Sequence, residues 1–399
     1  MSITDRRISV RLCRRGLRYA AVAAAVALSG TTVAACGSSS SSSSSSSSAS
    51  GAAASTTSKV NFATVTSAQA AGGMSALVAA AKKEGKLNVI TLPSDWANYG
   101  TQMKEFTSEY GIKIHDAIPA GSSAQEIQAI ESGRGRSSAP DVVDVGESFA
   151  VQDAALWAPY EVQTWSLIPT ANKASNGDWY NDYGGYVSFG CNLKIVKTCP
   201  TSWSQLASSQ YKKDVALNGV PGQAGAATGA VEAAAINNGG SFTNWKPGLA
   251  FFSKLKSEGN FNSTDCDSAA LIEAGQCPII INWDFLNTAG SWGLPKSADW
   301  VVNDPTGQSF DEYYAQAIAK TAPDPAAARL WEEFLYSTKG QNNFLAGYAR
   351  PIELTALVKA GTVNEAAYKK LPAVPSVAKV PTVAEEAAAA ALIAKGWTS

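Results

Sequence analysis

The sequence predicts an α/β protein whose core is a mainly parallel sheet covered by helices. The first 75 folded residues read as strand, helix, strand, helix, strand, after a leading helix. The chain has 399 residues, of which 45% are hydrophobic and 16% are charged, so most of it should fold and a fully disordered chain is excluded. At this length we expect one large lobe or two smaller ones.

Local signals place the first elements. The alanine-rich helix that begins at Met74 stops before Gly85, and a second helix stops before Gly111. Ser123 and Glu126 have the spacing of a capping box at the start of a third helix. The expected elements are helices at 74–83, 99–110 and 123–133 and strands at 87–92, 112–115 and 141–146.

A second set of elements follows residue 190. Asp324 and Pro325 form an N-cap with proline at the first helical position, which opens the last helix of this set. Pro278–Trp283 is an apolar run typical of a buried strand. The expected elements are helices starting at 202, 225, 248 and 325 and strands at 214–218, 278–283 and 313–319.

The amino terminus is typical of an exported protein. Six arginines precede an apolar run at 19–28, and small residues lead to Cys36. Val33-Ala-Ala-Cys36 resembles the lipobox of bacterial lipoproteins, which implies that residues 1–35 are removed and that Cys36 carries a diacylglyceryl anchor. The alternatives are an ordinary secretory signal, or export by a twin-arginine signal. The serine run at 38–48 lies in an expected flexible tether, residues 36–70.

Four cysteines remain in the folded part. Outside the cytoplasm an even number of cysteines indicates disulfides, and three pairings are possible. The local pairs Cys191–Cys199 and Cys266–Cys277 are preferred because each closes a short loop. A four-cysteine metal site is the alternative, although no CxxC motif is present.

Charge and motif content exclude several functions. Without residues 1–36 the chain has 26 basic and 32 acidic residues, which argues against nucleic-acid binding. His115 is the only histidine, and no G-x-S-x-G, P-loop or H-E-x-x-H motif is present, so we expect a protein that is not an enzyme. Paired carboxylates among Asp95, Glu147 and Asp284 leave a glycoside hydrolase as an alternative.

Candidate ligand contacts lie where expected strands end, because ligands of such sheets bind beyond the carboxyl ends of strands. Aromatic side chains flank Asp95 and Asp284, and this pairing suits an organic ammonium through ion pairing and cation–π contact. The turn that includes Gln223–Gly225 opens a helix whose free amides could meet an anion. The candidates are Asp95, Trp96, Tyr99, Glu147, Ser148, Gln223, Ala224, Gly225, Trp283, Asp284 and Tyr314.

The order of segments resembles the solute-binding proteins of ABC importers, of the type that includes polyamine, ferric-iron and 2-aminoethylphosphonate receptors. The resemblance is carried by residues 87–100, 139–146, 200–206, 273–284 and 326–335. It implies a two-lobed type II periplasmic-binding-protein-like fold, with lobe 1 at 75–185 plus 320–399 and lobe 2 at 190–310. Two hinge crossover strands are implied near 186–190 and 313–318.

The resemblance also implies a mechanism. One small-molecule solute is bound in the cleft between the lobes, the hinge closes, and the closed form docks on a membrane permease that works with a cytoplasmic ATPase. The protein is then expected to be a lipid-anchored monomer on the outer face of the cell membrane, without cofactor, metal or nucleic-acid partner.

Departures from the family pattern bear on the cargo. Ferric-iron receptors have a tyrosine pair where this chain has Trp283-Asp284, so iron is not expected. Polyamine receptors have an acidic residue in the strand that here reads 313–317, and it is missing, although Asp95 and Asp284 could serve. An amine-bearing, polyamine-like cargo is expected first. The alternative is a zwitterionic amino acid or aminophosphonate, with its amine near Asp284 or Glu147 and its acid on Gln223–Gly225.

Overall fold

The computed structural model describes residues 60–397 except 289, 291 and 374–377, and the described residues belong to one compact unit. The expected signal peptide, the lipidation site Cys36 and most of the tether lie outside these residues. Among the helices of the described ranges, none has the length and apolar character needed to cross a bilayer.

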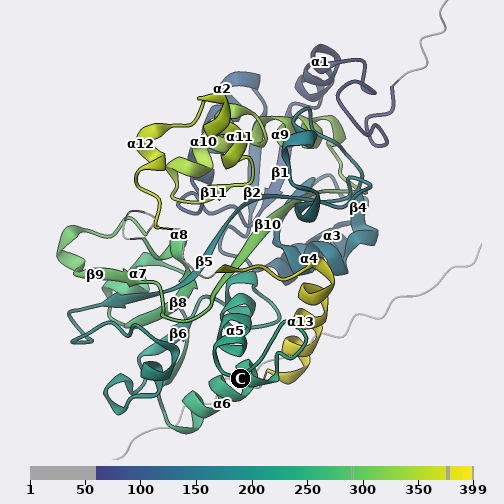
Figure 1. Cartoon of the computed structure of the whole chain (residues 1–399). Coiled ribbons are helices and arrows are strands. Elements are labelled where there is room, and N and C mark those ends of the chain that lie inside the picture. Colours follow the sequence, from purple (N-terminus) through teal and green to yellow (C-terminus); the bar gives the residue numbers. More distant parts are fainter. Residues whose placement is uncertain (1–59, 289, 291, 374–377, 398–399) are drawn as a thin grey trace, which may run out of the picture. The chain divides into compact units, whose positions relative to one another are not determined.

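The first set of elements follows the sequence pattern closely (Figure 1). The capping box differs from the expected pair, because Ser122 rather than Ser123 caps the helix and its amide donates to Gln125 Oε1 at 2.8 Å. β1 and β2 pair in parallel. The elements are α1 (Met74–Glu84), β1 (Lys86–Ile90), α2 (Tyr99–Tyr110), β2 (Lys113–Ala117), α3 (Ser123–Gly133), β3 (Val142–Gly146), α4 (Glu147–Gln152) and β4 (Trp157–Ala158).

Two long strands, β5 (Tyr180–Asn192) and β10 (Ser309–Ala319), connect the two sets of elements. β5 pairs with β10 up to Tyr186 and with β8 (Ile279–Trp283) from Val187 onward. β10 in turn pairs with β3 and β4 along its second half. These pairings are antiparallel, so the expectation of a mainly parallel sheet is wrong for this part, because both strands return across the molecule between the two sets.

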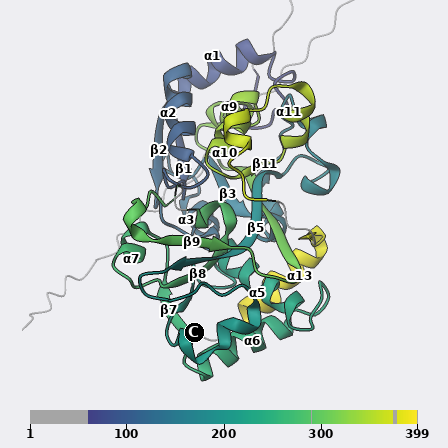
Figure 2. The same cartoon turned by 60° about the vertical axis from the view of Figure 1, so that its left-hand side comes forward.

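The second set has parallel pairing where strands alternate with helices. β6 (Val215–Leu217) lies between β7 (Phe261–Asp265) and β8, parallel to both. The helix expected at 202 is a short 3-10 helix, Trp203–Ala207. Figure 2 shows the helices of this set beside its strands. The remaining elements are α5 (Gly225–Asn237), α6 (Lys246–Ser257), α7 (Ala269–Glu273), α8 (Asp284–Asn287) and β9 (Trp300–Asn303).

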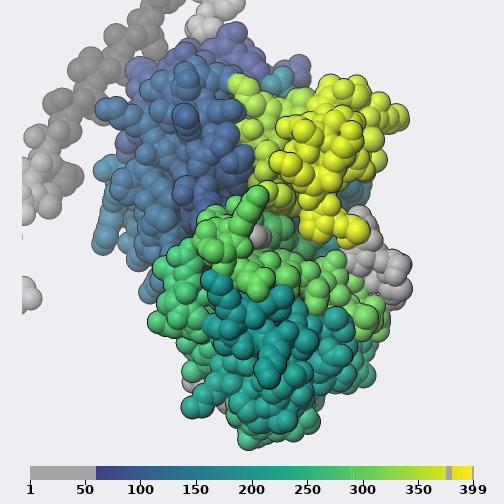
Figure 3. All heavy atoms as spheres, turned by 90° about the vertical axis from the view of Figure 1, so that its left-hand side faces the viewer, coloured from purple at the N-terminus to yellow at the C-terminus, as the bar shows by residue number. Residues whose placement is uncertain are grey.

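The carboxyl-terminal segment contributes to both sets. In Figure 3 residues near 350, drawn yellow, lie beside the blue amino-terminal part, above the teal and green second set. The last helix, α13 (Val383–Gly396), instead packs against α4 and α5. The other elements are α9 (Pro325–Leu335), α10 (Thr338–Ala346), β11 (Arg350–Pro351), α11 (Leu354–Ala360), α12 (Glu365–Tyr368) and β12 (Ala378–Lys379).

Residues 60–70, which the sequence assigned to the tether, are folded. Val65 and Ala68 are buried, and the guanidinium of Arg329 on α9 donates to the carbonyl oxygens of Val65 and Ala63, at 2.8 and 3.2 Å. The flexible segment therefore ends earlier than predicted, because these two apolar side chains find a place in the core.

Both local disulfides are confirmed, Cys191–Cys199 and Cys266–Cys277. The first lies at the end of β5, and the second joins the end of β7 to the segment before β8. The four-cysteine metal site is therefore wrong, since all four thiols are paired.

Candidate functional site

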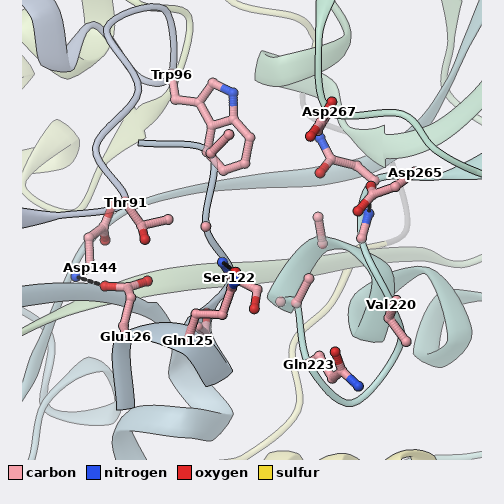
Figure 4. Close-up of a pocket in the computed structure, with 18 of the residues that line it drawn as sticks. Thr91, Trp96, Ser122, Gln125, Glu126, Asp144, Val220, Gln223, Asp265 and Asp267 are labelled. Carbon is pink, nitrogen blue, oxygen red and sulfur yellow. Dashed lines mark hydrogen bonds between the residues drawn. The ribbon is translucent and has the colours of Figure 1, made fainter. Parts of the chain in front are cut away.

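A cavity of about 220 Å³ lies between the two sets of elements (Figure 4). Sites for drug-sized ligands have volumes of about 300–1,000 Å³, so a cavity of this size suits a smaller solute. It is lined by Thr91, Trp96, Ala120, Gly121, Ser122, Ser123, Gln125, Glu126, Asp144, Asn218, Gly219, Val220, Gln223, Ala224, Gly225, Ala226, Asp265, Asp267 and Tyr314.

The wall from the first set of elements carries two buried carboxylates. Glu126 in the first turn of α3 accepts a hydrogen bond from the Asp144 amide at 3.1 Å, and Asp144 accepts one from the Tyr183 hydroxyl at 2.7 Å. The second oxygen of each, Glu126 Oε1 and Asp144 Oδ1, has no partner among the described residues. Burial raises the pKa of Asp144 to about 7 and that of Glu126 well above its usual value.

The opposite wall combines a helix start with two further carboxylates. Gly225 and Ala226 are the first residues of α5, where backbone amides have no intrahelical acceptor and can meet an anion. Asp265 and Asp267 flank Cys266, and the Asp265 carboxylate accepts a hydrogen bond from the Gly219 amide at 2.6 Å. The Cys266–Cys277 disulfide fixes this acidic segment against the start of β8.

Two aromatic residues, Trp96 and Tyr314, are among those that line the cavity. The half-buried Trp96 lies over it in Figure 4, on the loop between β1 and α2. Tyr314 on β10 also lines it and stacks on Tyr183 with 5.5 Å between ring centroids. Both rings could contact an ammonium or the carbon chain of a solute.

The two walls touch each other beside the cavity. The Ala124 amide on α3 donates to the Gln223 carbonyl oxygen at 3.1 Å. A Cβ atom placed on Gly225 would lie 3.3 Å from the Gly146 Cα, so only small residues allow the end of β3 to approach the start of α5 this closely. Backbone contact between the walls is what a closed cleft requires.

Five of the eleven residues predicted as ligand contacts line this cavity: Trp96, Gln223, Ala224, Gly225 and Tyr314. Asp95 is exposed and lies outside the lining. Tyr99 is buried, and its hydroxyl donates to Asp182 at 3.2 Å and accepts from Gln316 Nε2 at 2.8 Å. Glu147 and Ser148 are buried at the start of α4, also outside the lining.

Trp283 and Asp284 are buried and lie outside the cavity lining. Trp283 packs against α5, where a Cβ on Gly229 would come within 2.4 Å of the indole. Asp284 forms an ion pair with Arg350 at 2.6 Å, and both side chains are buried. Burial raises the pKa of Asp284 even though the guanidinium of Arg350 opposes the shift. For these residues, as for Asp95, Tyr99, Glu147 and Ser148, cargo contact stays a prediction.

Four lining carboxylates were missed as candidates: Glu126, Asp144, Asp265 and Asp267. Asp144 lies inside the predicted strand at 141–146, so the strand-end argument that selected Glu147 passed over it, although a carboxylate within an apolar strand is itself a signal. Glu126 was assigned only a capping role. No sequence motif near Asp265 and Asp267 identifies them as ligand contacts, because their position in the cavity wall depends on the pairing of β7 with β6.

Comparison with known protein sequences identifies the family to which this chain is similar. The sequence model of a family described as bacterial extracellular solute-binding protein matches residues 140–380. A periplasmic protein of Salmonella typhimurium, named for 2-aminoethylphosphonate binding, is 28% identical over 249 residues, which cover 61% of this chain and 70% of the relative.

Solved structures support the fold. The periplasmic binding protein AgtB from A. tumefaciens R10, in complex with agropinic acid, matches 78% of this chain and 97% of its own, with 16% identity and a TM-score of 0.60. The periplasmic binding protein AfuA from Actinobacillus pleuropneumoniae, with fructose-6-phosphate bound, aligns with 68% of this chain and over 86% of its own length. The two are 17% identical, and the TM-score is 0.57. The expected type II periplasmic-binding-protein fold is confirmed, while the limits of its two lobes stay a prediction.

Proposed function

Because the chain belongs to the bacterial extracellular solute-binding proteins, which deliver solutes to ABC importers, we propose that its cargo is a small zwitterion, an amino acid or an aminophosphonate. The same premise supports an extracytoplasmic location and a role in transport rather than in catalysis. The cavity of Figure 4 is the proposed binding site.

One observation carries the proposal: the cavity presents opposite polarities to one small ligand. The first amides of α5 form a pole for an acidic group, and a helix of 13 residues adds its dipole to them. Asp144 and Glu126 form a pole for an ammonium, because each has an oxygen that no described residue satisfies. A relative named for an aminophosphonate fits this pairing of charges.

A polyamine, which the sequence analysis expected first, is the second candidate here. Four carboxylates line the cavity, and its described lining includes no lysine or arginine. Asp265 and Asp267 could hold a second ammonium on the wall opposite Asp144. The two candidates differ in one chemical respect, namely whether the cargo needs an acidic group.

Ligand screening distinguishes the candidates. The chain from Gly37 onward would be unfolded thermally with 4-aminobutyrate, 2-aminoethylphosphonate, putrescine and spermidine. A ligand at 100 times its Kd adds about 2.7 kcal/mol to the stability, so the true cargo should raise Tm by several degrees. A shift with a zwitterion supports the proposal, and a shift with diamines alone would replace it by the polyamine reading. No shift with any of the four would refute both.

Matched variants test the site. Asp144→Asn should weaken the cargo that emerges from the screen at least tenfold by calorimetry, a loss of about 1.4 kcal/mol. Asp95→Asn is the control, since this carboxylate is on the neighbouring loop but outside the cavity lining. If Asp95→Asn weakens binding and Asp144→Asn does not, the cavity of Figure 4 is not the site.

The lipid anchor on Cys36 is a separate part of the proposal, supported by the lipobox resemblance alone. Cells that express the chain would be labelled with a fatty acid and fractionated. The wild type should carry label in the membrane fraction, and Cys36→Ser should lose it. Label that persists in Cys36→Ser would refute the anchor.

A further inference from the structure

Three glutamates from distant parts of the chain meet in the interior. Glu232 lies in the middle of α5, Glu312 on β10 and Glu386 in the first turn of α13. One carboxylate oxygen from each lies within 4.8 Å of the others, and all three residues are buried. None of the three lines the cavity of Figure 4, so this cluster is separate from the proposed cargo site.

Five oxygen atoms of the cluster are buried and have no hydrogen-bond partner among the described residues. They are both oxygens of Glu232, both of Glu386 and Oε2 of Glu312. Buried carboxylates cost several kcal/mol unless a donor or a cation satisfies them. Among the described residues, neither a basic side chain nor an amide reaches these five atoms. Two ways remain to satisfy them, namely protons shared between the carboxyl groups of Glu232 and Glu386, or a cation from outside the chain.

We propose that Glu232, Glu312 and Glu386 bind a calcium ion. Oxygen ligands are what hard divalent cations prefer, and three glutamates can offer the six oxygens that a Ca²⁺ shell starts from. Ligands of Ca²⁺ at ~2.3–2.6 Å lie at most ~5 Å apart, which accommodates the 4.8 Å limit of this cluster. Mg²⁺ is less suitable, because it usually keeps several waters and these three side chains are buried away from solvent.

The ion would join three elements that matter for cargo capture. α13 is the last helix of the chain, and it packs beside α4 and α5 in Figure 1. α5 opens the proposed anion pole of the cavity, and β10 is one of the two strands shared by both sets. Calcium should therefore hold α13 against α5 and β10 and stabilise the whole chain.

The test measures calcium directly and needs no cargo. The chain from Gly37 onward, dialysed against EDTA and then against Ca²⁺, should retain about one calcium per chain by elemental mass spectrometry. Ca²⁺ at 100 times its Kd should raise Tm by about 5 °C. Glu386→Gln and Glu232→Gln should lose both the bound ion and the shift.

Glu332→Gln is the matched control. Glu332 on α9 is also fully buried with both oxygens unpartnered, but it lies outside the cluster, so this variant should keep the calcium response. Absence of bound calcium in the wild type, or equal loss in Glu332→Gln, would overturn the proposal. So would binding of Mg²⁺ or Mn²⁺ without Ca²⁺, or metal-independent stabilisation by Glu386→Gln, which would indicate shared protons. Cargo affinity is a separate readout, so failure of the cargo proposal leaves this test intact.

Discussion

The Arg350 Nη1 atom lies 2.6 Å from Asp284 Oδ2, and this buried ion pair holds three strands together. Asp284 follows β8, and its other oxygen accepts from the Tyr186 amide on β5 at 3.0 Å. Arg350 begins β11 and also donates to the Pro372 carbonyl oxygen at 2.7 Å. The carboxylate is thus satisfied from within the protein, at the point where β5 changes partners.

Arg350→Ala should destabilise the protein strongly, because it leaves the Asp284 charge buried and unpaired. The expected loss of unfolding free energy is about 3–5 kcal/mol, measured by denaturant unfolding. Lys339→Ala is the control, since Lys339 pairs with Glu109 at the same 2.6 Å distance but on the surface. That exposed pair should contribute at most about 1 kcal/mol. Equal losses in the two variants would contradict this account of Asp284.

The affinity for an ammonium-bearing cargo should rise with pH. Burial raises the pKa of Asp144 to about 7, and only its ionised form attracts the ammonium. Affinity by calorimetry should increase by up to about tenfold per pH unit below pH 7 and level off above it. Burial also raises the pKa of the neighbouring Glu126 well above its usual value, so its ionisation should act in the same direction.

Asp144→Asn provides the control for this pH dependence, and the affinity of this variant should not change with pH through this group.

The raised pKa of Asp144 has the opposite effect on the stability of the ligand-free protein. This carboxyl contributes stability below its unfolded pKa of about 4, and that contribution is lost as pH rises through about 7. Affinity that falls with rising pH in the wild type would contradict the assignment of Asp144 to the amine.

Gly225→Val should weaken cargo binding by tenfold or more, because a branched side chain separates the two walls of the cavity. A single Cβ at Gly225 would lie 3.3 Å from the Gly146 Cα and 3.5 Å from the Tyr314 hydroxyl. Gly225→Ala therefore needs a shift of only a few tenths of an ångström and should retain most of the affinity. Calorimetry on both variants checks the order, and equal binding by Gly225→Val and wild type would contradict the need for close approach.

Local signals account for the elements that the sequence predicted well. α2 begins and ends, and α5 begins, at the residues that the sequence pattern predicted, since such signals act within a few residues. The site was predicted less completely, because it depends on contacts between distant segments. In the sequence, Asp284 stands next to Trp283, and a carboxylate beside an aromatic ring is typical of an ammonium site. In the structure, the guanidinium of Arg350, 66 residues later, pairs with the Asp284 carboxylate instead. Asp265 becomes a lining residue only through strand pairing, and α13 was not assigned at all.

Removal of the Cys266–Cys277 disulfide should reduce both stability and cargo affinity. The bridge closes a loop with a sequence separation of 11, so the paired Cys→Ser variant should lose about 3 kcal/mol of unfolding free energy. It also fixes Asp265 and Asp267, which line the cavity on either side of Cys266. The matched control replaces Cys191 and Cys199, whose separation is 8 and which do not line the cavity. This second variant should lose similar stability and bind cargo as the wild type does, below the Tm of both variants. Equal loss of affinity in the two variants would show that the bridge acts through global stability alone, and not by holding the acidic wall in place.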